Sequence, residues 1–258
     1  MEFQTKKKFG QNFLTDKNLL SAIVSDAQIT SKDQVLEIGP GMGALTEVLN
    51  SSAKRVVSFE IDNDLKDFLL AKNLKNTQFY FQDVMQKDTK EIEEMFGGNY
   101  KIVANLPYYI TTPILFKFLG SKNLKSITVM VQKEVAQRMV AKPGSKDFGV
   151  LSVSIDVYGD AKITRNVGRE MFSPAPNVDS AVVRIDVKNK YNISNYKDFH
   201  EFVKNIFSMR RKTLLNNLSH AYSFSKQSLE KILGPETLRK RAEEFSVEEI
   251  VEMYKKLF

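Results

Sequence analysis

The sequence predicts an α/β fold: a largely parallel sheet with helices on both faces and an antiparallel end, followed by a small all-helical C-terminal domain. Two observations support this prediction. From Gln34 onward, short β-branched or apolar runs alternate with longer amphipathic stretches, which is the pattern of βαβ units. From about Lys190 onward, the pattern is helical and rich in charge. We expect the boundary near residues 187 to 195, which divides the chain into domains 1–190 and 191–258.

The expected strands of the first domain are, in chain order, QVLEIG, RVVSFE, TQFYFQD, KIVANLP and SITVMVQ. The helical runs ALTEVLN and NDLKDFLLAK separate the first three, and helices at about 112–119 and 133–140 follow the last two. After Gly149 the runs VLSVSIDVYG and AKITRNV, split by Gly159 and Asp160, resemble strands, and so does NVDSAVVRIDV. These three runs predict the antiparallel end.

Composition narrows the possible chemistry. The 258 residues can bury a substantial core, and the absence of cysteine removes disulfides, thiolate nucleophiles and most structural zinc sites. The histidines are His200 and His220, so a reaction centred in residues 1–199 uses no imidazole base and no metal held by histidine. We therefore expect no metal.

The N-terminus shows no apolar signal segment, and no stretch approaches the roughly 18 apolar residues of a membrane span. We expect a cytoplasmic protein that does not enter a membrane.

The formal net charge of +7 opens the question of the partner. A surplus of Lys and Arg suits a polyanion, because each neutralised phosphate releases counterions. A basic protein without a polyanionic partner could have the same net charge. Net charge alone therefore favours neither interpretation.

A glycine-rich loop, EIGPGMG, follows the first expected strand and opens a helix, where a parallel sheet presents its ligand crevice. Gly39 and Gly41 let the backbone turn tightly and approach a ligand. Glu60 ends the next strand 21 residues after Gly39, a position from which a carboxylate accepts hydrogen bonds from ribose hydroxyls. Asp83 ends a third strand and could accept from an adenine amine, although a strand-end Asp is often only a cap. Together these residues favour a cofactor that contains adenosine.

The motif NLPYYI, residues 105–110, follows the buried strand KIVA and is the most specific in the chain. An adenine N6 amine is a poor nucleophile because its lone pair is delocalised into the ring. The side-chain oxygen of Asn105 and the backbone carbonyl of Leu106 could accept from the two amine hydrogens, and Pro107 would fix the turn. Tyr108 would stack on the base. The alternative is a buried Asn cap beside a core Tyr.

Six motifs, FGQNFL, EIGPGMG, FEID, NLPYYI, QKEVAQRMVAKPGSKDFGVLSV and FSPAPNVDSAVVR, stand in the order found in the ribosomal RNA adenine N6-dimethyltransferase family. The sequence resembles this family from about residue 6 to about residue 218, and within it the KsgA (RsmA) small-subunit branch. The resemblance implies a Rossmann-like S-adenosylmethionine methyltransferase sheet. It also implies transfer of four methyl groups to two adjacent adenosines near the 3′ end of small-subunit (16S) rRNA.

The resemblance implies further site residues. Asn12 and Leu14 would join Gly39, Glu60, Asp83 and Asn105 as contacts of S-adenosylmethionine, and Phe172 would close on the target base opposite Tyr108. The C-terminal domain would dock on RNA. Candidate phosphate contacts are basic residues that a solvated surface explains nearly as well: Lys6, Lys7, Lys8, Arg210, Arg211 and Lys212. We expect a monomer that acts on the small ribosomal subunit.

Three other functions stay open. The resistance branch of the same family dimethylates one adenosine of large-subunit RNA, although NLPYYI, DFGVLSV and MRRKTLLNNL look more like the small-subunit branch. A ribosome-assembly factor would mainly bind immature subunits. A nicotinamide dehydrogenase is disfavoured by the GxGxG spacing and by the lack of a histidine in the sheet domain.

Overall fold

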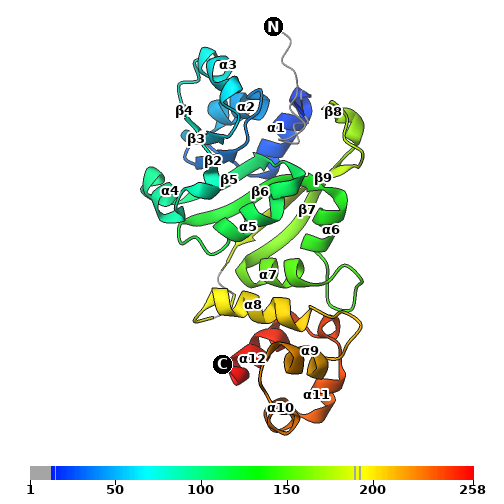
Figure 1. The fold of residues 1–258 in the computed structure, drawn as a ribbon. Coiled ribbons are helices and arrows are strands. Elements are labelled where there is room, and N and C mark those ends of the chain that lie inside the picture. Colours follow the sequence, from blue (N-terminus) through cyan, green and yellow to red (C-terminus); the bar gives the residue numbers. More distant parts are fainter. Residues whose placement is uncertain (1–12, 15, 189, 192) are drawn as a thin grey trace. The chain divides into compact units, whose positions relative to one another are not determined.

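A computed structural model describes residues 13–14, 16–188, 190–191 and 193–258 of the chain (Figure 1). The chain divides into two compact units. The first contains the described residues up to Ala136 together with Ala161–Val187, and the second contains Gln137–Asp160 and Lys188–Phe258. None of the described helices is both long and apolar enough to cross a membrane.

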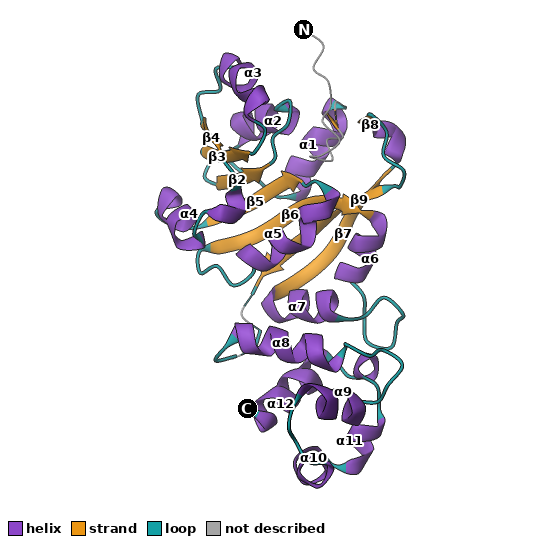
Figure 2. Ribbon diagram, in the orientation of Figure 1, coloured by secondary structure: helices purple, strands orange, loops and turns teal. Residues whose placement is uncertain are grey.

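The first unit is built on a seven-stranded sheet with the order β4-β3-β2-β5-β6-β9-β7 (Figure 2). The first five strands in this order, β4, β3, β2, β5 and β6, pair in parallel with their neighbours. Strand β9 pairs antiparallel to β6. The α/β fold with an antiparallel end is therefore confirmed. The strands are β2 Gln34–Ile38, β3 Arg55–Glu60, β4 Thr77–Phe81, β5 Tyr100–Asn105, β6 Leu124–Gln132, β7 Gly159–Val167 and β9 Ser180–Val187, and the separate pair β1 Phe13–Leu14 and β8 Phe172–Ser173 is antiparallel.

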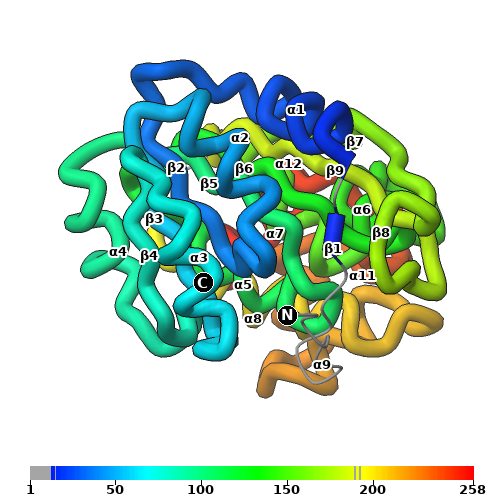
Figure 3. Tube along the Cα trace, turned by 90° about the horizontal axis from the view of Figure 1, so that it is seen from above, coloured from blue at the N-terminus to red at the C-terminus, as the bar shows by residue number. Residues whose placement is uncertain are grey.

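Helices cover both faces of this sheet, as expected. Seen from above in Figure 3, α1 and α2 lie on one side of β5 and β6, and α5 lies on the other. On the α1 side, Ile23 of α1 and Leu49 of α2 pack with Val35, Val103 and Met130 of the strands into one buried cluster. The helices are α1 Lys17–Asp26, α2 Ala44–Ser52, α3 Lys66–Ala71, α4 Thr89–Phe96, α5 Thr111–Phe118 and α6 Lys133–Met139, which runs into the second unit.

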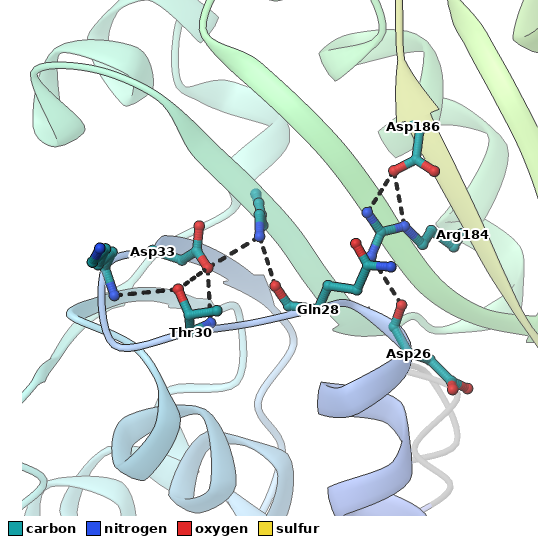
Figure 4. A network of polar contacts seen from close by, with 8 residues as sticks. Asp26, Gln28, Thr30, Asp33, Arg184 and Asp186 are labelled. Carbon is teal, nitrogen blue, oxygen red and sulfur yellow. Dashed lines mark hydrogen bonds and ion pairs between the residues drawn. The ribbon is translucent and has the colours of Figure 1, made fainter.

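A polar network fastens the end of α1 to the sheet (Figure 4). The buried guanidinium of Arg184, on β9, donates to the backbone carbonyl of Asp26 at 3.0 Å and to the Asp186 carboxylate at 2.8 Å. Arg165 on β7 forms an ion pair with the Asp26 side chain at 3.2 Å. The charge of Arg184 thus has an acidic partner and a carbonyl acceptor, which a buried charge requires.

The second unit is helical, with a core formed by residues such as Val153, Phe202, Leu218 and Ile250. Its helices are α7 Val150–Tyr158, α8 Tyr196–Ile206, α9 Leu214–Ala221, α10 Lys226–Leu233, α11 Pro235–Arg239 and α12 Val247–Leu257. The expected division was near residue 190, and the second unit also takes in residues 137–160.

The run VLSVSIDVYG is helix α7, so the prediction of a strand there was wrong. The helix is buried almost all round, including Ser152 and Ser154, so it shows no polar face that would reveal a helical period. Ser152 Oγ instead donates to the carbonyl of Arg138 at 2.7 Å. Tertiary packing has overridden the β preference of the alternating valines and isoleucine. The run AKITRNV lies within strand β7, and NVDSAVVRIDV contains strand β9, so these two strand predictions are confirmed.

Candidate active site

A pocket of about 440 Å³ lies in the first unit, where the parallel strands end. Loops that follow β2, β3, β4 and β5 line it, together with the small β1–β8 pair. It brings together ten of the predicted site residues: Leu14, Gly39, Gly41, Glu60, Asp83, Asn105, Leu106, Pro107, Tyr108 and Phe172. Asn12 lies outside the described residues, and so do Lys6, Lys7 and Lys8.

The glycine loop requires glycine for two reasons. Gly39 and Gly41 have φ values of +70° and +55°, a left-handed region that strains other residues. A Cβ on Gly41 would also lie 2.9 Å from a ring carbon of Phe13. The loop therefore keeps its path against Phe13 only with a glycine at position 41.

Glu60 is anchored in the pocket by two backbone donors. Its carboxylate accepts from the backbone N–H of Gly41 at 3.1 Å and from that of Asp62 at 2.8 Å, and the residue is 4% exposed. Burial raises the pKa of Glu60, and the two backbone donors partly offset this. The acid at the end of β3 thus joins the glycine loop to the next turn.

Asp83 caps a short helix and also lines the pocket. Its Oδ1 accepts from the backbone N–H of Met85 at 2.9 Å, which caps the short 3-10 helix η3, Val84–Gln86. The residue also lines the pocket. Capping fixes the side chain at the pocket wall, and its contact with a ligand stays a prediction.

The NLPYYI motif turns sharply out of β5. The carbonyl of Pro107 accepts from the backbone N–H of Ile110 at 3.1 Å, and helix α5 then begins at Thr111. Leu106 is buried beneath the turn, and Asn105 and Pro107 line the pocket. The turn therefore places Asn105 and Pro107 in the pocket that the glycine loop also lines.

Two aromatic residues of the motif differ in their surroundings. The Tyr108 hydroxyl lies 2.8 Å from Ser180 Oγ on β9, and burial raises its pKa. Tyr109 is 59% exposed and also lines the pocket. Ser180 thus fixes the ring of Tyr108, while Tyr109 stands open at the pocket.

Phe172 is only 6% exposed. It pairs with Leu14 across the β1–β8 ladder and packs in the apolar cluster on the α1 side of the sheet. It still contributes to the pocket wall. Its contact with a target base stays a prediction.

Three basic candidates lie in the second unit, in the turn between α8 and α9. The guanidinium of Arg210 is already engaged, because it donates to the carbonyls of Lys146 and Phe148 at 2.7 and 3.2 Å and lies 3.7 Å from Glu243. Arg211 and Lys212 are exposed. Of the three, the latter two are better placed for an outside partner.

The sequence is similar to those of known proteins along almost its whole length. A family model described as ribosomal RNA adenine dimethylase matches residues 2–257. The chain belongs to this family. It is 44% identical to ribosomal RNA small subunit methyltransferase A of Clostridioides difficile (strain 630), over 96% of this chain and 89% of that protein. The protein of the same description from Leuconostoc mesenteroides is 45% identical, over 97% and 89%.

Solved structures extend the likeness. A dimethyladenosine transferase from Plasmodium falciparum superposes with a TM-score of 0.79 at 27% identity, covering 95% of this chain and 98% of that one. The 23S rRNA methyltransferase ErmE has a TM-score of 0.69 at 24% identity, covering 95% and 99%. At that identity the second similarity shows a shared fold.

The pocket and the basic turn also involve residues that sequence reasoning missed. Ser180, which fixes Tyr108, comes from β9, and no local signal marks it. Glu37 stands inside the glycine motif but was not singled out. In the second unit, buried Asn217 holds the basic turn, because its Oδ1 accepts from the backbone N–H of Met209 at 2.9 Å. Among the described residues, no group of three or more acids and histidines could hold a metal ion.

Proposed function

We propose that the chain transfers methyl groups from S-adenosylmethionine to the N6 amine of two adjacent adenosines near the 3′ end of small-subunit (16S) rRNA. The product is N6,N6-dimethyladenosine, and the reaction contributes to small-subunit biogenesis. The main support is that Glu60, Asp83 and Asn105 line one pocket with the glycine loop, in a chain 44% identical to small-subunit methyltransferases A.

The pocket fits the cofactor. Glu60, held by two backbone donors, would accept from the ribose hydroxyls, and Asp83 would accept from the adenine amine of the cofactor. Leu14 and the tightly turned Gly39 and Gly41 would contact it, together with Asn12. S-adenosylmethionine supplies the electrophilic methyl group.

The residues of the NLPYYI motif would prepare the substrate. The Asn105 side-chain oxygen and the Leu106 carbonyl accept from the N6 hydrogens, which returns electron density to nitrogen and aims it at the methyl donor. Tyr108 and Phe172 hold the base between them. These residues would hold the N6 nitrogen towards the methyl group that bound S-adenosylmethionine would supply, and the methylated amine would lose its proton to solvent.

Replacing Tyr108 tests the stacking role. We expect Tyr108→Ala to lower kcat/KM about 5- to 150-fold, because a base stacked on an aromatic ring is stabilised by about 1–3 kcal/mol. Tyr108→Phe keeps the ring and loses only the contact with Ser180 Oγ, so it should stay within roughly tenfold of wild type. Equal losses in the two variants, measured as methyl transfer to undermethylated small subunits, would contradict the stacking role.

The basic turn tests the docking role of the second unit. We expect Arg211→Ala and Lys212→Ala each to reduce the salt slope of RNA affinity by about 1, because each removes one phosphate contact. Arg210→Ala should instead lower the melting temperature, because Arg210 holds the carbonyls of Lys146 and Phe148. Titrations of small subunits at several salt concentrations measure the slopes. Unchanged slopes for Arg211→Ala and Lys212→Ala would exclude these contacts.

We propose a monomer without a metal that acts in the cytoplasm on the small subunit. Labelled S-adenosylmethionine, offered with undermethylated small subunits and separately with protein-free large-subunit RNA, tests the choice of RNA. Label in the small subunit alone supports the proposal. Label in the large-subunit RNA would move the chain to the resistance branch, and label in neither would favour an assembly factor.

A further inference from the structure

Glu37 is a buried acidic residue just before the glycine loop, and the proposed reaction gives it no role. It is 1% exposed and lies near the end of β2, where it contributes to the pocket wall. Its Oε2 accepts from Thr46 Oγ1 on α2 and from Ser58 Oγ on β3, both at 2.8 Å. Its Oε1 is buried and has no hydrogen-bond partner. One oxygen is thus held by two hydroxyls, while the other is unsatisfied.

An ionised carboxylate in this position is costly, because a buried charge needs a partner. The charged neighbour that acts on Glu37 is Glu60, which has the same sign. From α1 and α2, the pocket residues on this face, Leu20, Ile23, Ala44 and Leu45, are apolar, and α2 adds only the hydroxyl of Thr46. Burial raises the pKa of Glu37 to about 7. Within the described part of the chain, no cation is among the groups that shift this pKa.

We propose that Glu37 is a positioning residue that responds to charge: it is neutral in the free pocket and ionises when a cationic group of the ligand enters. This inference rests on the proposed function, because S-adenosylmethionine is a ligand that carries two cations, a sulfonium and an ammonium. S-adenosylhomocysteine keeps the ammonium alone, and 5′-methylthioadenosine has neither. Ligand binding then releases a proton from Glu37, and the ionised acid favours the methyl donor over relatives that lack the cation in question.

The sign of the pH dependence follows from this linkage. Below about pH 7 the free protein holds the Glu37 proton, and the bound protein has released it, so affinity for the cationic ligand rises with pH and levels off above about 7. In the free protein the acid is more strongly protonated when folded than when unfolded. The free energy of unfolding therefore falls as pH rises from about 4.5 to about 7.

Glu37→Gln is a matched variant, since its amide oxygen can still accept from Thr46 and Ser58 while its charge is fixed at zero. Calorimetry of S-adenosylmethionine binding, in buffers of different ionisation enthalpy from about pH 6 to about pH 8, measures proton release. We expect wild type to release up to one proton and to bind several-fold more tightly at the higher pH. Glu37→Gln should lose both effects, and its melting temperature should lose part of its pH dependence.

The ligands separate the possible outcomes. If Glu37→Gln weakens the binding of S-adenosylmethionine alone, the sulfonium is the partner of Glu37. If it also weakens the binding of S-adenosylhomocysteine, the ammonium is the partner. Binding of 5′-methylthioadenosine should not change. The proposal is overturned if the variant keeps the wild-type proton release, or if all three ligands weaken equally. Wild-type protein that binds none of the three would instead contradict the proposed function.

Discussion

Asn105→Ala is expected to reduce kcat for methyl transfer by about two to three orders of magnitude. An oriented acceptor that acts on the charge developing at the reacting nitrogen has an effect of the size seen when one oxyanion-hole group is removed. The turn around Pro107 should survive, because the contact between its carbonyl and the N–H of Ile110 does not involve the Asn105 side chain. Single-turnover transfer to undermethylated small subunits measures the effect.

A control distinguishes chemistry from folding. Asn166→Ala removes the same side chain from an exposed position on β7 and should leave kcat near the wild-type value. If Asn105→Ala transferred methyl groups at the wild-type rate, the proposed acceptor role would be wrong. If it lost transfer but still associated with small subunits, the loss would belong to catalysis and not to docking.

Glu60→Ala is expected to weaken cofactor binding by about 10- to 150-fold, since a hydrogen bond to a charged group contributes about 1.5–3 kcal/mol. The substitution also frees the backbone N–H groups of Gly41 and Asp62, which loosens the glycine loop. Isothermal titration with S-adenosylhomocysteine measures the affinity.

Glu47→Ala is the matched control for Glu60→Ala. Glu47 lies in the first turn of α2 and forms a surface ion pair with Lys72 at 2.5 Å. Pairs of this kind contribute little, so affinity should change less than about fivefold. An unchanged affinity in Glu60→Ala would contradict the ribose contact.

The sequence predicted the parts of the site that depend on one strand at a time. Gly39, Glu60, Asp83 and Asn105 each stand at or just after the carboxyl end of an expected strand, and parallel strands bring such ends to one edge. Their meeting in one pocket follows from topology, without knowledge of side-chain contacts.

Contacts between distant segments were not predictable in this way. The contact of Tyr108 with Ser180 depends on the place of β9 in the sheet. The hydrogen bonds that Glu37 accepts from the hydroxyls of Thr46 and Ser58 depend on how α2 lies against β3. Helix α7 was mistaken for a strand because burial on nearly all sides left no polar face in its sequence. Local patterns cannot report what a segment will pack against.

Mapping the methylated nucleosides tests the central claim most directly. Undermethylated small subunits are incubated with the protein and S-adenosylmethionine, their RNA is digested, and mass spectrometry locates the products. The account predicts N6,N6-dimethyladenosine at two adjacent positions near the 3′ end of the small-subunit RNA. Methyl groups at another atom, at a single adenosine, or at none would contradict it.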